Sequence, residues 1–277
     1  MGLQVNRSSL CPALKRLSLK GKATYEGLVS KIRGSPVVTG DETGWRVGGL
    51  SHWLWGFSTP GETVYQISRG RGFTEAAQVL GEDYSGILIA DGWAPYRRFG
   101  EATLQTCLTH LLRRCSLILD QATRGAVRFP RQVRDLLEKA LLIRDRRDRG
   151  ELTPHGVQSL RGRLQAQMSR LLSGRFTNTE NRRFAKHLHN YEDALFVFLK
   201  HEGGEATNWR GEHAMRAGVM VRKCCGGGNR TPAGAEVQAV LMSLLRTCHQ
   251  KALDPREVFA QILRAPQPQP SMLLIDG

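Results

Sequence analysis

The sequence is poor in acidic residues, and it has neither a long apolar run nor a paired cysteine motif. Its 277 residues include 25 Asp plus Glu against 40 Lys plus Arg, which gives a formal net charge of +15. No apolar run approaches the ~20 residues that a membrane-spanning helix needs. The N-terminus also lacks the apolar core of a signal peptide. These absences exclude the class of proteins with membrane-spanning helices and predict no membrane partner.

The cysteines do not form a recognisable metal-binding or disulfide pattern. No Cys-x-x-Cys pair occurs, which excludes a zinc ribbon. Cys107 and His110 offer two ligand types within a Cys-x-x-His element, but a structural zinc site needs four ligands. Free, buried thiols in a reducing cytoplasm are the favoured interpretation. The six cysteines are Cys11, Cys107, Cys115, Cys224, Cys225 and Cys248.

The excess of positive charge indicates a polyanionic partner. A sequence pI near 10.1 is typical of chains that bind nucleic acid. An anionic membrane surface is the alternative, as is a basic protein without such a partner. Membrane binding requires a basic amphipathic helix with a bulky aromatic face, and no stretch has that pattern. Nucleic acid is therefore the expected partner.

Alternating and continuous apolar runs predict a mixed α/β fold. The run Ile87–Ala90 follows Gly86 and is typical of a strand buried on both faces. The order of expected elements is three strands, helix, strand, short helix, strand, and it predicts a ribonuclease H-like mixed five-stranded sheet flanked by helices. The expected strands cover residues 35–41, 52–57, 63–67, 87–90 and 102–107, and the expected helices residues 73–80 and 94–99.

Helical periodicity from about residue 111 predicts an all-α insertion before the last catalytic helix. Apolar residues recur at helical spacing in residues 133–142 and 160–172, and residues 187–200 are expected to form one more helix. The predicted organisation is a basic helical leader (1–33), a ribonuclease H-like core (34–110), the α-helical insertion (111–205), the C-terminal part of the core (206–263) and a flexible tail (264–277).

Two expected strands end on carboxylates, Asp41 and Asp91. If these strands are neighbours, both side chains meet at one edge of the sheet, where carboxylate oxygens suit Mg²⁺. Asp91-Gly92 is also a common turn dipeptide, which is the alternative for Asp91. Glu212 can supply a third carboxylate from a later helix, although Glu212 and Arg216 have the i,i+4 spacing of an ordinary surface ion pair.

An ordered series of motifs resembles the central domain of insertion sequence 66 family transposases. The motifs lie at residues 40–47, 52–55, 81–84, 90–96, 107–113, 208–223, 226–230, 234–239 and 245–248. The resemblance implies a DDE triad, carried by motif onto Asp41, Asp91 and Glu212, which hold two Mg²⁺ ions that Mn²⁺ can replace. It further implies Mg²⁺-dependent cleavage and transesterification of DNA.

The resemblance also implies partners and a location. It predicts a bacterial, cytoplasmic and nucleoid-associated enzyme that acts on element ends and target DNA as a homo-oligomer, with accessory proteins encoded by the element. Family members are expected to carry N-terminal zinc-binding and helix-turn-helix-like segments that are not found in this sequence. Two competing hypotheses are a catalytically silent DNA-binding remnant and a ribonuclease H-like nuclease without strand transfer.

Basic and aromatic residues near these motifs are candidate DNA contacts, because phosphate contacts supply affinity and register. Trp93 can stack on a base. Cys107 and His110 are accessory candidates, with a core cysteine and a helix-capping histidine as the alternative. The alternative to DNA contact is that the arginines lie on a solvated helical face. This alternative is favoured for residues 144–149. The basic candidates are Arg113, Arg114, Arg216, Arg222, Lys223 and Arg230.

Overall fold

The computed structural model describes residues 7–201, 204–224 and 226–274, which belong to two compact units. The first unit draws on residues 1–86, 98–102 and 209–277, and the second on residues 87–97 and 103–208. Within the described residues, five strands make one mixed sheet in the order β3-β2-β1-β4-β5. This α/β arrangement is consistent with a ribonuclease H-like fold, so the predicted fold class is confirmed.

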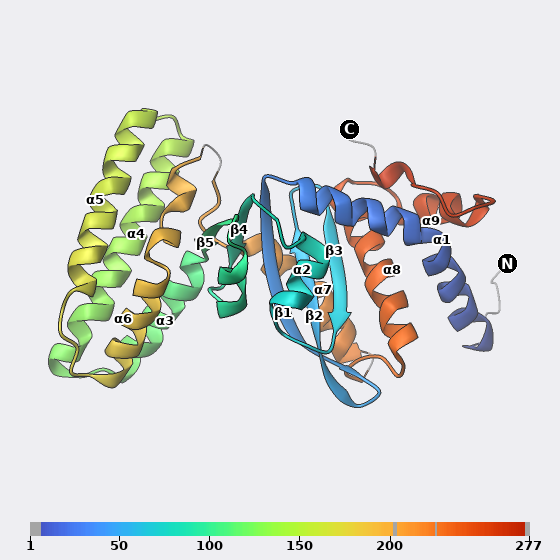
Figure 1. The fold of residues 1–277 in the computed structure, drawn as a ribbon, viewed down its shortest axis with the longest axis horizontal. Coiled ribbons are helices and arrows are strands. Elements are labelled where there is room, and N and C mark those ends of the chain that lie inside the picture. The colour runs from blue at the N-terminus through green and yellow to red at the C-terminus, as the bar shows by residue number, and fades with distance from the viewer. Residues whose placement is uncertain (1–6, 202–203, 225, 275–277) are drawn as a thin grey trace. The chain divides into compact units, whose positions relative to one another are not determined.

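Three antiparallel strands build the sheet of the first unit: β1 (Val37–Val47), β2 (Leu50–Ser58) and β3 (Thr63–Ser68) (Figure 1). Gly48 and Gly49 join β1 to β2 with φ of 57° and 81°, as a two-residue hairpin turn with both φ positive requires. Asp41 pairs with Gly56 in the middle of β1. The prediction that this strand ends at Asp41 is wrong, because residues 42–47 continue the ladder opposite residues 50–55.

The helices of the first unit cover this sheet and one another. α7 packs on β1 and β2, α8 packs on β3, and α1 runs beside α8 (Figure 1). α8 begins at a proline preceded by Thr231, whose hydroxyl accepts the Gly234 N–H at 3.1 Å. The bounds are α1 (Arg7–Gly34), α2 (Phe73–Leu80), α7 (Trp209–Cys224), α8 (Pro232–Gln250) and α9 (Pro255–Arg264).

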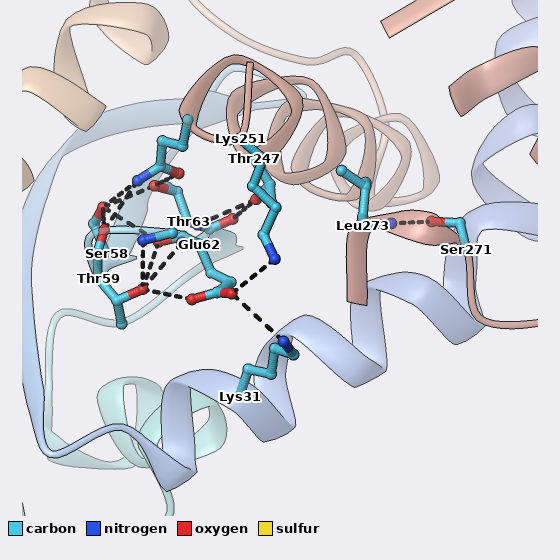
Figure 2. Close-up of polar contacts among 11 residues, drawn as sticks. Lys31, Ser58, Thr59, Glu62, Thr63, Thr247, Lys251, Ser271 and Leu273 are labelled. Atoms are coloured by element: carbon cyan, nitrogen blue, oxygen red, sulfur yellow. Dashed lines mark hydrogen bonds and ion pairs between the residues drawn. The ribbon is translucent and has the colours of Figure 1, made fainter. Parts of the chain in front are cut away.

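A polar network fixes the turn between β2 and β3 against the helices (Figure 2). The Thr59 hydroxyl donates to the Glu62 carboxylate at 2.7 Å and accepts the Glu62 N–H at 3.0 Å. The same carboxylate lies 3.3 Å from Lys251 Nζ and 3.8 Å from Lys31 Nζ. The Thr63 N–H donates to Thr247 Oγ1 at 3.2 Å. The turn is therefore bound to both α8 and α1.

Part of the C-terminal tail, which the sequence predicts to be flexible, packs against α1. The Ser271 N–H donates to Thr24 Oγ1 at 3.1 Å, and Leu273 is fully buried. Leu274 occupies the space where a Cβ at Gly27 would stand. Residues Met272–Leu274 form a short 3₁₀ turn, η5. Residues 275–277 lie outside the described part.

The second unit combines two short strands with helices that form their own core (Figure 1). β4 (Ile87–Ala90) and β5 (Thr103–Thr106) are parallel. The periodic residues Val133, Leu137, Leu164 and Met168 are buried as predicted. Every helix among the described residues is too short or too polar to cross a membrane. The helices are η1 (Ala94–Arg98), α3 (Leu108–Gln121), η2 (Arg124–Val127), α4 (Arg128–Asp148), α5 (Pro154–Leu172) and α6 (Thr179–Asn190).

The helix predicted over residues 187–200 is wrong. α6 ends at Asn190, and two 3₁₀ turns follow, η3 (Glu192–Ala194) and η4 (Val197–Leu199). The Gln105 side chain explains the change, because it donates to the Leu195 carbonyl at 3.3 Å and accepts the Phe198 N–H at 2.9 Å. These bonds, made from β5, take backbone groups that a continuous helix would use itself.

Candidate active site

Asp41 and Glu212 project to the same face of the sheet in the first unit. Paired residues of antiparallel strands share a face, so Asp41 lies on the side of Gly56. That side is covered by α7, since Met215 Cε is 2.5 Å from the position of a Cβ at Gly56. Glu212 precedes Met215 by three residues and lies on the same face of α7. The structure therefore brings two of the three predicted carboxylates to one face.

Two glycines allow α7 to approach the sheet this closely. A Cβ at Gly56 would press on Met215, and a Cβ at Gly218 would overlap Leu54 of β2. The Tyr65 hydroxyl also donates to the Ala214 carbonyl at 2.6 Å, which joins β3 to the middle of α7. The distance between Glu212 and the sheet thus depends on two glycines, Gly56 and Gly218, and on one buried hydrogen bond.

Glu42, the acid next to Asp41, is directed to the opposite face and is neutralised there. Its side chain is 1% exposed, and Oε1 accepts from Arg71 Nε at 2.9 Å and Nη2 at 2.6 Å. The Arg71 guanidinium lies 4.5 Å from the centre of the Trp53 ring. Asp41 Oδ1 accepts the Glu42 N–H at 2.9 Å, which orients the Asp41 carboxylate. The two acids therefore have separate roles.

Asp91 lies in the second unit, directly after β4, as predicted. Its Oδ1 accepts the Trp93 N–H at 2.9 Å, and Gly92 between them has a φ of 87°. Such a left-handed residue favours glycine. The turn interpretation of Asp91-Gly92 is thus correct in geometry. It also fixes the direction of the Asp91 carboxylate, so the turn and a functional role are compatible.

A group of aromatic and basic side chains, His187, Tyr191 and Arg97, lies beside the Asp91 turn. It is not among the site residues predicted from the sequence. A Cβ at Gly92 would stand 3.2 Å from His187 Cε1. The His187 and Tyr191 rings are 5.0 Å apart, and the Arg97 guanidinium lies 5.6 Å from the Tyr191 ring centre. Burial and the charge of Arg114 lower the pKa of His187, while Asp91 acts in the opposite direction. The i,i+4 spacing of His187 and Tyr191 was the only sequence signal.

Cys107 and His110 form a polar pair at the start of α3. Cys107 is fully buried, and its Sγ accepts the Asn208 N–H at 3.2 Å. Burial raises the pKa of the Cys107 thiol, but hydrogen bonds from His110 and the Asn208 backbone outweigh it, so the pKa is lowered overall. The described cysteines are all free, and Cys225 lies outside the described residues. Cys107 directly precedes the first residue of α3, so the pair lies at the N-terminus of that helix.

The predicted DNA contacts differ in how accessible they are. Arg113, Arg216, Lys223 and Arg230 are exposed. Arg216 makes no ion pair among the described residues, so the alternative of a surface pair with Glu212 is not observed. Arg114 and Trp93 are half-buried, and the Arg114 guanidinium lies 5.0 Å from the Phe184 ring centre. Arg222 donates to the Gly44 carbonyl and, at 3.3 Å, to Thr43 Oγ1.

A mixed α/β sheet with an acid inside β1, a second acid on the helix above it and a third after β4 defines a ribonuclease H-like protein with carboxylates as its candidate functional groups. The chain belongs to the transposase IS66 family, which it matches over residues 1–237. It is also 24% identical over 300 residues to the uncharacterized protein y4qI of Sinorhizobium fredii (strain NBRC 101917 / NGR234). That alignment covers 95% of this chain and 53% of the relative, so the chain spans about half of the relative's length.

Proposed function

We propose that this chain carries the catalytic activity of a DNA transposase, with Asp41, Asp91 and Glu212 as its DDE carboxylates. Membership of the transposase IS66 family supports the reaction class. One observation carries the residue assignment. Asp41 of β1 and Glu212 of α7 lie on the same face of the sheet, the face that α7 covers.

The donor set fits two divalent cations. Carboxylate oxygens are hard ligands of the kind that Mg²⁺ prefers, and Mn²⁺ accepts the same set. Asp41, Asp91 and Glu212 would hold these ions. When bound, such a pair supplies charge stabilisation for the attacking and leaving oxygens of an in-line phosphoryl transfer. The Asp41 and Asp91 carboxylates are each oriented by a backbone N–H, as a pre-organised ligand requires.

The reaction consists of two phosphoryl transfers that leave no covalent bond to the protein. Water first attacks a phosphodiester at the element end, and the P–O bond to the 3′ oxygen breaks to release a 3′-hydroxyl. That hydroxyl then attacks a phosphodiester of the target DNA, and the displaced oxygen leaves as a new hydroxyl. The exposed residues Arg113, Arg216, Lys223 and Arg230 contribute phosphate contacts that hold both DNA segments. A homo-oligomer on the DNA and accessory proteins of the element complete the proposed assembly.

Replacing Asp91 by Asn tests the assignment. We expect D91N to lose Mg²⁺- or Mn²⁺-dependent nicking of DNA by at least ~10³-fold, equivalent to a barrier increase of about 4 kcal/mol. DNA affinity measured in EDTA should stay near that of the wild type. Asp120→Asn, an exposed acid of α3 in the same unit, is the matched control and should retain nicking. Nicking by D91N at the wild-type rate would refute the triad.

The two competing functions give different results in the same assays. A DNA-binding remnant would show salt-dependent affinity and no metal-dependent nicking by the wild type. A ribonuclease H-like nuclease would nick DNA but form no strand-transfer products with a labelled element end. A transposase is expected to yield both nicked and joined products.

A further inference from the structure

A cavity of about 480 Å³ lies within the first unit, near the turn of the β1–β2 hairpin. It is bounded on one side by strand residues and on the other by the end of α7 and the glycine loop that follows. The lining residues that matter chemically are Arg46, His52, Trp53, Arg222, Gly226 and Gly227. None of the residues lining this cavity is acidic.

Arg222 is held in place by hydrogen bonds, Arg46 is exposed, and neither is neutralised by an ion pair among the described residues. Arg222 donates to the Gly44 carbonyl and to Thr43 Oγ1, which use part of its five N–H donors. His52 Nδ1 lies 3.1 Å from the Leu50 carbonyl. In the described part of the chain, neither Arg46 nor Arg222 forms an ion pair with a carboxylate. Arg71, by contrast, is paired with Glu42 and does not line the cavity.

The glycine loop presents bare backbone to the same cavity. Gly226 and Gly227 have φ of 67° and 105°, and a Cβ at either position would meet nothing within 4 Å. The left-handed φ of both residues, and not internal packing, favours glycine there, and the result is backbone without side chains at the cavity. Gly228 does pack tightly, since a Cβ there would overlap the Arg46 carbonyl oxygen.

Hydrogen bonds on both sides fix the loop to β1. The Asn229 N–H donates to the Arg46 carbonyl at 2.9 Å, and the Gly48 N–H donates to the Asn229 carbonyl at 2.9 Å. The Trp45 indole N–H donates to Asn229 Oδ1 at 2.7 Å. The backbone wall of the cavity is thus a defined surface of the folded unit, fixed before any ligand binds.

We propose that this cavity binds a phosphodiester group of the DNA backbone, with Arg46 and Arg222 as the phosphate contacts. Guanidinium groups match the two free oxygens of a phosphate, and side-chain-free glycines let the sugar–phosphate chain approach closely. Trp53, which lies on the same face of the sheet as Arg46, gives an apolar surface beside the sugar. The proposal takes DNA as the ligand from the proposed function, but it does not require that the chain cleave DNA.

The test measures binding of the full chain to a fluorescently labelled duplex by anisotropy, in EDTA, over a range of salt concentrations. Each phosphate contact contributes about 0.9 to the slope of log affinity against log salt. Arg46→Gln should lower the affinity about tenfold and reduce the slope by about one. Arg222→Gln should behave in the same way, and the double variant should lose about twice as much slope.

Arg69→Gln is the matched control, because Arg69 is exposed, belongs to the same unit and lies outside the cavity. Arg69→Gln should retain the wild-type slope. Arg46 is exposed, so R46Q remains informative if R222Q does not fold. Wild-type slopes for R46Q and R222Q, or equal losses in R69Q, would overturn the proposal, as would a wild-type chain that binds acidic protein but no duplex.

The outcomes separate this site from the proposed catalytic activity. Reduced slopes in R46Q together with a wild type that never nicks DNA would support the cavity and refute the transposase activity. Normal nicking together with unchanged slopes would refute the cavity alone.

Discussion

The imidazole of His187 is held neutral by its surroundings at neutral pH. Burial and the nearby Arg114 lower the pKa of His187, and the Asp91 carboxylate only partly opposes them. The Tyr191 ring lies tilted beside the imidazole and adds no charge near neutral pH, since burial raises the Tyr191 pKa. A neutral imidazole beside Gly92 packs against the Asp91 turn without competing for its carboxylate. His187 is thus suited to support the position of Asp91.

The lowered pKa makes a prediction about stability. The unfolded chain binds a proton at His187 near the ordinary pKa of about 6.5, whereas the folded chain does so only at lower pH. Between these values the unfolded state binds more protons, so the free energy of unfolding falls as the pH falls through this window. His187→Gln should show a smaller loss between neutral pH and pH ~5 than the wild type.

Urea unfolding of both proteins at each pH measures this difference. His155→Gln, which replaces an exposed histidine of α5, should keep the wild-type pH dependence. The same dependence in H187Q and wild type would contradict the assignment of the shift to His187.

At the scale of elements, the sequence predicted most of the fold because local patterns determine it. The helix predicted over residues 73–80 is α2 itself, and the strand predicted at 87–90 is β4. The errors arise where residues that are distant in the sequence determine the local structure. β1 continues past Asp41 because β2 pairs with it through Val47. The helix after residue 190 breaks because Gln105 binds the backbone there.

The candidate site was predictable only through the resemblance to a family. Spacing alone favoured a turn for Asp91 and a surface pair for Glu212. The common face of Asp41 and Glu212 depends on Gly56 and Gly218, which have no periodic signal. Residues 144–149 illustrate the opposite case. Arg147, expected on a solvated face, is only 10% exposed and donates to the Phe198 and His201 carbonyls at 2.6 and 2.9 Å.

The contact between β3 and α8 leads to a prediction about the free energy of unfolding. The Thr247 hydroxyl accepts the buried Thr63 N–H at 3.2 Å and donates to the Thr63 carbonyl at 3.3 Å. Thr247→Val keeps the shape but leaves both backbone groups without a partner, which should lower the free energy of unfolding by about 1–3 kcal/mol. Chemical denaturation measures the loss.

Thr74→Val is the control for that measurement. Thr74 is an exposed residue of α2 in the same unit, so its replacement should change stability by less than about 0.5 kcal/mol. Equal effects of T247V and T74V would show that the paired hydrogen bonds add nothing measurable to the contact between β3 and α8.

At the scale of the whole molecule, the net charge of +15 attracts any polyanion, so affinity for DNA needs to be separated from affinity for anionic lipid. Phosphate contacts persist at physiological salt when many act together, whereas stable attachment to a lipid surface also needs an apolar face to insert. The exposed large apolar residues among the described residues are spread over several elements, with three of them, Leu10, Leu14 and Leu19, on α1.

We therefore expect the chain to retain duplex DNA at about 150 mM salt and to release vesicles that contain about 30% phosphatidylserine. Co-sedimentation with vesicles and anisotropy with DNA, each at low and physiological salt, provide the comparison. Both ligands should bind at low salt, since charge alone suffices there. Retention of vesicles at physiological salt, at affinities equal to those for DNA, would contradict the assignment of the basic surface to nucleic acid. Loss of both ligands would show that the charge is too dispersed to form a binding surface.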